Sequence, residues 1–358
     1  MNQLDNKSYI KKLDKKDVLS SIENLPRQFE QVAQDFSKID LPLKYFQVKD
    51  IVISGMGGSG LGGHIVQSLF FEELKIPLRI INGYALPKAV NKNTLCIIVS
   101  YSGTTEETIA TYFEAKKKKA NIFVITRGAK LAQIVKKEKT PAYIFEERFN
   151  PTKQPRLGLG YTLTAELLLL NKLRLLNFSQ KEKSITLKAL EKFNKIFGQK
   201  RKTSQNIAKK IALKLYQNQK TPILVASEFL IGSTHAFANQ LNETAKTLAV
   251  YFALPELNHH LMEGLTFPKS NRKNLFFLFF NSSLYQSKII LRYRITQDVL
   301  AKNKIISLEY KMASSDKISQ TAELLTLGSY VSFYLGILNK IDPSEIPWVD
   351  YFKKKLSH

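Results

Sequence analysis

The sequence predicts an α/β protein with two doubly wound parallel-sheet domains in tandem, and three observations support this fold class. The chain has 358 residues, enough for about two domains of ordinary size. In each half, short apolar runs alternate with stretches of helical periodicity, the pattern of parallel strands joined by helices. Near the start, the stretch Ile51–Gly63 reads as a strand, a glycine-rich loop and a helix N-terminus. We expect a first domain at residues 1–180 and a second at 181–358.

The first half opens with a helix and continues as a β/α series. Apolar residues near helical spacing, including Leu19, Ile22 and Phe29, predict a helix within residues 8–38. The strands expected next are Ile51–Ser54, Leu78–Ile81, Leu95–Ser100, Ile122–Thr126 and Ala142–Phe145. We expect three helices among and after these strands. The first runs from the glycine loop to about Leu74, the second begins at Glu106, and the third is Leu163–Leu176.

A Lys-rich helical stretch, Ser184–Gln217, leads into the second half. The strands expected there are Pro222–Ala226, Leu248–Phe252, Leu275–Phe280 and Lys304–Leu308. The helices expected there are Ser233–Leu248, Tyr285–Leu300, Ile318–Leu338 and Val349–Leu356. Because the two halves share this alternation and a similar length, we interpret them as a tandem duplication whose second copy lacks the glycine loop.

Composition limits the possible functions. No apolar run approaches the ~20 residues of a membrane span, and the polar segment Met1–Ser8 is not a signal peptide, so we expect a cytoplasmic protein. The net charge of +24 favours anionic ligands in general. The lysines of the chain are scattered without interleaved aromatic residues, which argues against specific nucleic-acid binding. The single cysteine, Cys96, lies in an apolar run and is expected to be a buried strand residue.

The glycine loop has the character of an anion cradle. Gly55, Gly57 and Gly60 fit the dinucleotide pattern G-x-G-x-x-G, but this pattern alone is weak evidence. The acidic residue that usually follows about 20 positions later is absent, and no Walker lysine follows the glycines. We therefore favour a phosphate monoester over a dinucleotide, with glycines that serve only close helix packing as the alternative.

A second loop of small polar residues follows the Leu95–Ser100 strand. Its hydroxyls belong to Ser100, Ser102, Thr104 and Thr105, and a predicted helix begins directly after them. Such a cluster is usually a helix N-cap. Two clusters at consecutive strand ends are more specific, because ligands of open α/β sheets bind at the carboxyl ends of the strands. Donors without a fixed positive charge suit reversible binding of a phosphate handle.

Six motifs resemble those of the sugar isomerase (SIS) domain proteins and, among these, of the bifunctional phosphoglucose/phosphomannose isomerases. In chain order they are I-S-G-M-G-G-S-G (53–60), V-S-Y-S-G-T-T-E-E-T (99–108), Q-P-R-L-G-L-G-Y (154–161), N-E-T-A-K (242–246), L-P-E-L-N-H (254–259) and D-P-S-E-I-P with F-K (342–353). They span nearly the whole chain in the order of the family. The resemblance implies two flavodoxin-like SIS domains.

The resemblance also implies the roles of individual residues. The implied phosphate-binding set is Gly57, Gly58, Ser59, Ser100, Ser102 and Thr105. Arg156 resembles the arginine that stabilises an enediolate, and Glu243 resembles the base that moves a proton between C1 and C2. His259 resembles the acid/base that opens the sugar ring and is contributed by the partner subunit. Lys353 is the best match for a lysine beside the ring oxygen, with Lys354 and Lys355 as alternatives.

These residue types suit aldose–ketose isomerisation. Ring opening needs a group that gives and accepts a proton near neutrality, and imidazole does so. A partly buried carboxylate then removes the weakly acidic proton beside the carbonyl, and an arginine meets the developing negative charge. The scheme needs no cofactor and no metal, and the five histidines (His64, His235, His259, His260 and His358) do not form a cluster with metal-ligand spacing.

Two departures from the family pattern stand out. Asn258-His259-His260 replaces the usual N-H-N, so the residue behind the imidazole differs. Arg127 lies near the ligand edge of the first sheet, where it either adds a phosphate contact or obstructs one.

The expected function is therefore a homodimeric isomerase that interconverts glucose 6-phosphate, and also mannose 6-phosphate, with fructose 6-phosphate through a cis-enediol. Two alternatives remain. One is a non-catalytic SIS-domain regulator that binds sugar phosphates, and the other is a different phosphosugar isomerase.

Overall fold

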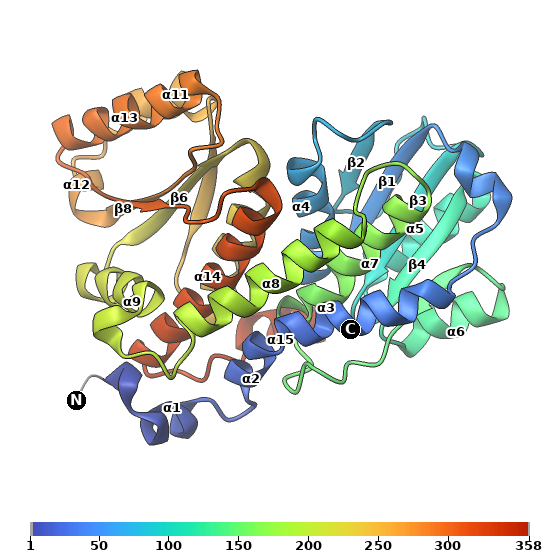
Figure 1. Ribbon diagram of the computed structural model, residues 1–358, viewed down its shortest axis with the longest axis horizontal. Helices are drawn as coiled ribbons and strands as arrows, with labels where there is room; N and C mark the ends of the chain where they lie inside the picture. The colour runs from blue at the N-terminus through green and yellow to red at the C-terminus, as the bar shows by residue number, and fades with distance from the viewer. Residues whose placement is uncertain (1–2, 357–358) are drawn as a thin grey trace.

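The computed structural model describes residues 3–356 and contains two parallel β-sheets, each within its own layered α/β half (Figure 1). The first sheet has the strand order β2-β1-β3-β4-β5, and the second has the order β7-β6-β8-β9. The strands of the first sheet are β1 (Asp50–Gly55), β2 (Leu78–Ile81), β3 (Thr94–Ser100), β4 (Asn121–Thr126) and β5 (Ala142–Ile144). Those of the second are β6 (Thr221–Ser227), β7 (Val250–Leu254), β8 (Leu275–Asn281) and β9 (Ile306–Lys311). The first four strands of each half thus follow one topology, which reverses direction between β1 and β3 and between β6 and β8.

Helices cover both faces of the first sheet. The helices that precede the second sheet in the chain are α1 (Lys7–Leu13), α2 (Val18–Glu23), α3 (Leu25–Asp35), α4 (Leu61–Leu69), α5 (Glu106–Lys117), α6 (Ala129–Lys137), α7 (Leu159–Lys172) and α8 (Gln180–Phe197). Side chains alternate across β3, so Cys96 and Ile98 pack with Tyr112 of α5, whereas Ile97 belongs to the main core on the other face with α3 and α7. Cys96 is buried, as predicted, and burial raises the pKa of its thiol to about 12.

The second sheet is covered in the same way. Its half contains α9 (Ile207–Asn218), α10 (Ile231–Thr244), α11 (Leu257–Gly264), α12 (Asn271–Asn274), α13 (Ser287–Lys302), α14 (Lys317–Leu338) and α15 (Pro347–Leu356). Helix α10 contacts β6 and β7, and α13 contacts β7, β8 and β9. Helix α4 of the first half packs against α10, where Gly232 meets the backbone of His64 so closely that a Cβ atom would lie 2.4 Å from the His64 carbonyl oxygen. The two halves therefore meet through α4 and α10.

Helix α14 contradicts the expectation that no apolar run approaches the length of a membrane span. By length and apolar composition it is the single helix within residues 3–356 that could cross a membrane. The whole of its most apolar window is buried, because α14 packs against α8, α9 and α10 between the two halves (Figure 1). This apolar run serves as a core helix.

All nine predicted strands occur, whereas several helix boundaries were wrong. Strands β7 and β9 begin two residues later than predicted. The stretch Ser184–Gln217 contains two helices, because α8 ends before Gly198 and the Asn206 side chain caps α9. The segment 8–38 is divided into three helices, since the Asp14 carboxylate accepts the N–H groups of Val18 and Leu19 and starts a new helix there. Helix α4 ends five residues early at Leu69, and α7 begins inside the predicted loop.

Three helices were not predicted, namely α6, α11 and α12. All are short, between four and nine residues, so their apolar periodicity is too brief to distinguish from a loop. Helix α11 matters most, because it places His259 on a helix rather than in a loop.

Candidate active site

The two polar loops lie side by side at the carboxyl edge of the first sheet. They follow β1 and β3, which are neighbours and flank the point where the strand order reverses. The first loop forms a 3-10 turn, Gly57–Ser59, and Gly57 has a φ of +49°, which favours glycine. Buried Ser59 connects the loops, because its Oγ accepts the N–H of Tyr101 at 2.9 Å. The predicted phosphate loops are therefore adjacent in space.

The hydroxyls of the second loop bond to one another. Ser100 Oγ donates to Thr105 Oγ1 at 3.1 Å, and Ser102 Oγ lies 3.4 Å from the same oxygen. The N–H of Gly103 donates to Ser100 Oγ at 3.1 Å. Three of the predicted phosphate ligands thus converge within hydrogen-bonding distance at the N-terminus of α5, whose free N–H groups favour an anion.

Arg156 lies directly behind the glycine loop. It belongs to a 3-10 turn, Pro155–Leu157, and a Cβ atom on Gly58 would come within 2.8 Å of the Arg156 backbone nitrogen. Only glycine allows these two backbones to approach so closely. The Q-P-R loop is therefore fixed against the phosphate loop.

The Arg156 side chain is only 1% exposed and reaches across to the second half. Its Nε donates to Thr244 Oγ1 at 3.1 Å, and its Nη2 donates to the carbonyl oxygens of Pro343 and Ser344 at 2.9 and 3.0 Å. Its Nη1 donates to Gln154 Oε1 at 3.1 Å and lies 3.5 Å from Glu243 Oε2. Because Nη1 carries two N–H groups, one of them remains available on the Glu243 side.

Glu243 occupies the last turn of α10, and its side chain is 30% exposed. Burial raises the pKa of its carboxyl above the ordinary value. The charges of Arg156, Lys353 and Lys246 oppose that rise, in decreasing order. The carboxylate is thus a stronger base than a solvated one, with cations beside it.

The three candidate lysines lie on α15, whose residues are all exposed. Lys353 is the one whose charge acts on Glu243, and Lys355 Nζ instead lies over the Tyr351 ring at 5.9 Å. The structure therefore pairs Glu243 with Arg156, and the charge of Lys353 on α15 acts on the same carboxylate.

His259 does not join this group within the chain. It is exposed on α11, which packs against β7 and α13 at the far end of the second half (Figure 1). The neighbouring His260 packs near Phe252, with ring centroids 6.0 Å apart, and Asn258 Nδ2 donates to Thr296 Oγ1 at 2.8 Å. The α11 helix is thus anchored by its neighbours while the His259 side chain faces outward.

Sequence reasoning missed a hydrogen-bonded chain between the phosphate loops and Arg156. Tyr101, whose N–H binds Ser59, accepts a hydrogen bond at its OH from Asn150 Nδ2 at 2.7 Å. Asn150 Nδ2 also donates to the carbonyl oxygen of Gln154 at 3.0 Å, and the Gln154 side chain accepts from Arg156. Asn150 and Gln154 lie within the predicted loop 150–162, but no sequence pattern indicated that their side chains would meet Tyr101.

Arg127 is engaged in an ion pair. Its Nη1 lies 2.6 Å from Glu147 Oε1, and the other oxygen of Glu147 accepts the Tyr101 hydroxyl at 2.9 Å. Arg127 therefore supports the same network at the loop edge.

The structure gives no indication of a metal centre in the part of the chain that it describes. No group of three or more His, Cys, Asp or Glu side chains within residues 3–356 has a metal-binding arrangement. His64 and His235 form a pair with ring centroids 4.7 Å apart, and His358 lies outside the described residues.

Known families and structures match both halves of the chain. Residues 44–149 match the SIS domain family, and residues 204–356 match the bacterial phospho-glucose isomerase C-terminal SIS domain. Among solved structures, a hypothetical protein of Thermus thermophilus has a TM-score of 0.73 at 16% identity and covers 98% of this chain and 94% of its own. The C-terminal domain of glucosamine-fructose-6-phosphate aminotransferase from Francisella tularensis has a TM-score of 0.68 at 15% identity, covering 90% and 96%. These structures support the predicted tandem SIS fold.

Curated relatives extend the similarity to nearly the full length. A bifunctional phosphoglucose/phosphomannose isomerase of Caldicellulosiruptor bescii is 30% identical and covers 95% of this chain and 99% of its own. The protein of that name from Thermoplasma volcanium is 28% identical over 90% and 97% of the two chains. A D-glucosamine-6-phosphate 4-epimerase of Sulfolobus acidocaldarius is 26% identical over 70% and 74%. The chain belongs to the bifunctional phosphoglucose/phosphomannose isomerase family.

Proposed function

We propose that the protein interconverts glucose 6-phosphate, and also mannose 6-phosphate, with fructose 6-phosphate. The observation that carries the proposal is the Arg156–Glu243 pair. Arg156 Nη1 lies 3.5 Å from Glu243 Oε2, and the Arg156 backbone packs against the glycine loop. A base and a fixed cation beside an anion cradle are what proton transfer next to the carbonyl of a phosphorylated sugar requires. Family membership supports the same reaction.

The phosphate handle is assigned to the two loops of the first sheet. The proposed ligands are Gly57, Gly58, Ser59, Ser100, Ser102 and Thr105. Their hydroxyls, which bond to one another here, are donors that can turn to the phosphate oxygens. No lysine or arginine is included in this set, so the handle is held without being activated as a leaving group.

The proton transfer is assigned to Glu243. It removes the proton from C2 of the open-chain aldose and returns a proton to C1, through a cis-enediol. The remaining Nη1–H of Arg156 stabilises the developing enediolate, and because Arg156 is buried this interaction is weakly screened. Reprotonation of C2 on either face gives glucose or mannose 6-phosphate.

Ring opening is assigned to His259 of a partner subunit and to Lys353. His259 is exposed on α11, which packs against β7 and α13, so a homodimer in which α11 approaches the partner's loops is part of the proposal. Lys353 is assigned to assist at the ring oxygen, and its charge effect on Glu243 supports that assignment. We place the reaction in the cytoplasm, within glycolysis and gluconeogenesis, and expect it to need no metal.

A coupled assay with fructose 6-phosphate, with and without a chelator, tests the function. Turnover to both aldose phosphates that is unaffected by chelator is the expected result, and an unchanged substrate would refute the proposal. Glucosamine 6-phosphate serves as a further substrate, because one relative is named a D-glucosamine-6-phosphate 4-epimerase. Conversion of that sugar alone would favour the second candidate, a different phosphosugar isomerase.

Glu243→Gln tests the assigned base. We expect kcat to fall by about 10³-fold with sugar-phosphate binding retained, because the amide cannot accept the proton. Glu191→Gln, at an exposed position on α8, is the matched control and should retain full activity. Full turnover by Glu243→Gln would refute the assignment.

A further inference from the structure

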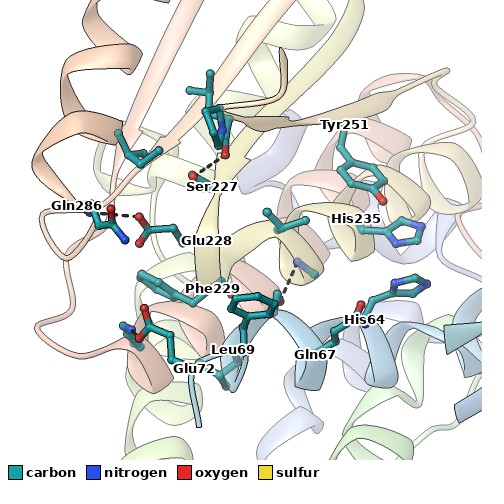
Figure 2. Close-up of a pocket in the computed structure, with 18 residues that line it drawn as sticks. His64, Gln67, Leu69, Glu72, Ser227, Glu228, Phe229, His235, Tyr251 and Gln286 are labelled. Atoms are coloured by element: carbon teal, nitrogen blue, oxygen red, sulfur yellow. Dashed lines mark hydrogen bonds and ion pairs between the residues drawn. The ribbon is translucent and has the colours of Figure 1, made fainter. Parts of the chain in front are cut away.

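A second cavity of about 570 Å³ lies at the carboxyl edge of the second sheet (Figure 2). The ends of β6 and β7 and the start of α13 form one side, and α4 of the first half forms the other. It therefore lies at the carboxyl end of β6, the strand beside which the order of the second sheet reverses, and open α/β sheets bind ligands at such an edge. Its volume lies within the usual range of about 300–1,000 Å³ for small-molecule sites.

The loop beside this cavity repeats the backbone of the glycine loop with different side chains. In both halves a 3-10 turn joins the central strand to its helix, Gly57–Ser59 in the first and Glu228–Leu230 in the second. The first residue of each turn has a positive φ, +49° at Gly57 and +46° at Glu228. The duplicated position thus holds a carboxylate, and the next one holds a phenyl ring at Phe229. A carboxylate there repels the phosphate that the first loop attracts.

Glu228 is the uncompensated charge of the cavity. The other charged lining residues, Glu72 and Lys317, pair with each other at 2.8 Å. Burial lowers the pKa of His64, and it lowers that of His235 to about 4, so both imidazoles are neutral near pH 7. One Glu228 oxygen accepts the Gln286 N–H at 3.2 Å, which leaves the carboxylate with further acceptor capacity.

The opposite end of the cavity is aromatic. His235 stacks on Tyr251 with ring centroids 4.6 Å apart, and in the described part of the chain its buried Nδ1 has no hydrogen-bond partner. In Figure 2 the Glu228 carboxylate and the His235–Tyr251 stack lie at two ends, with Phe229 and Leu69 along the floor. The cavity is therefore an apolar space with one acidic end.

We propose that this cavity is a second ligand site, which binds a small organic amine with its ammonium group on Glu228 and its apolar body against Phe229. The site excludes phosphorylated sugars, so it is distinct from the proposed active site. Because α4 begins at the glycine loop and ends at this cavity, a bound amine contacts the same helix that the phosphate does.

Two probes of the same shape and opposite charge test the site. Phenethylamine and phenylacetate are titrated separately into the full-length protein without any sugar phosphate, and binding is followed by ligand-observed NMR. We expect saturable binding of phenethylamine and binding of phenylacetate at least about tenfold weaker, since one charge-assisted hydrogen bond is gained or lost. Equal binding of the two probes, or no saturable binding of phenethylamine, would overturn the proposal.

Two variants locate the site. Glu228→Gln should remove the preference for the amine, whereas the surface variant Glu191→Gln should retain it. Ile289→Phe adds bulk from α13 and should weaken phenethylamine binding even if Glu228→Gln does not fold. An amine preference that survives in both cavity variants contradicts the assignment. The absence of isomerase activity would leave these measurements unaffected, so the two proposals fail independently.

Discussion

The carboxyl edges of the two sheets share one backbone plan and differ in chemistry. At the first edge, glycine at position 58 lets the backbone of Arg156 pack against the loop. At the second, Glu228 and Phe229 occupy the corresponding turn, and the edge faces a cavity. If both proposed sites bind their ligands, the two edges share a place for a ligand, and the side chains at two turn positions select which ligand each edge accepts.

The second half nevertheless contributes side chains and carbonyl groups to the candidate site at the carboxyl edge of the first sheet. Glu243, Thr244 and Lys353 come from α10 and α15, and the carbonyl oxygens of Pro343 and Ser344 hold the guanidinium of Arg156. The second half thus has no glycine loop of its own and instead supplies groups that contact Arg156 of the first half.

Among the variants that compare the two halves, Gly58→Ala should cause the largest loss of activity. The new Cβ would lie 2.8 Å from the Arg156 nitrogen, so the Q-P-R loop must shift, and a displacement of about 1 Å in a positioned group costs about 10²-fold in rate. We expect this loss in kcat/KM in the coupled assay. Gly83→Ala is the control, because nothing lies within 4 Å of its Cβ position. If Gly58→Ala were as active as Gly83→Ala, the close approach of backbone to Arg156 would not matter to the site.

Tyr101→Phe tests whether the hydrogen-bonded chain orients Arg156. Loss of the hydroxyl removes the links to Asn150 and Glu147, and we expect kcat to fall by about tenfold with KM nearly unchanged. Tyr310→Phe removes another buried hydroxyl, which donates to the carboxylate of Glu323 in the second half. Both variants should lose about 1–2 kcal/mol of stability, and an equal loss of kcat in both would mean that the effect is general.

The contact between the two halves should weaken in acid. His64 and His235 meet between α4 and α10, and both pKa values lie below the ordinary 6.5 of histidine, that of His235 at about 4. Between pH 6.5 and 4 the unfolded chain therefore binds more protons than the folded one. The free energy of unfolding consequently falls as pH decreases over this range. Urea unfolding at several pH values should show a shallower decline in His235→Phe, by about 1 kcal/mol over this range. An unchanged decline would exclude His235 as its source.

The smallest effect concerns the two positive φ angles. Gly57→Ala introduces a side chain at φ +49° with nothing within 4 Å, so we expect a loss of about 1 kcal/mol from backbone strain alone. Glu228→Gly relieves the same strain at φ +46° and loses one hydrogen bond to Gln286, so stability should change by less than about 1 kcal/mol. Thermal unfolding of the two variants measures both, and equal destabilisation would show that the turns are not equivalent.

Much of the fold was predictable because strands and loops leave local signals. All nine strands, and both polar loops at consecutive strand ends, follow from apolar runs, glycines and serines read along the chain. Helix ends were less accessible, since they depend on side-chain caps such as Asp14 and Asn206. The candidate site was predicted as a set of residues by resemblance, and their roles remain predictions.

The tandem parallel-sheet architecture was predictable from the sequence alone, as was the glycine loop that we assign to phosphate binding, because both depend on neighbours in the chain. The tertiary structure decided which distant groups meet: Arg156 with Glu243, Lys353 rather than Lys355 near that carboxylate, and Tyr101 with Asn150. It also revealed the positive φ of Glu228 and the cavity beside it. These features depend on how helices from both halves pack, and packing brings together residues whose separation in sequence carries no local signal.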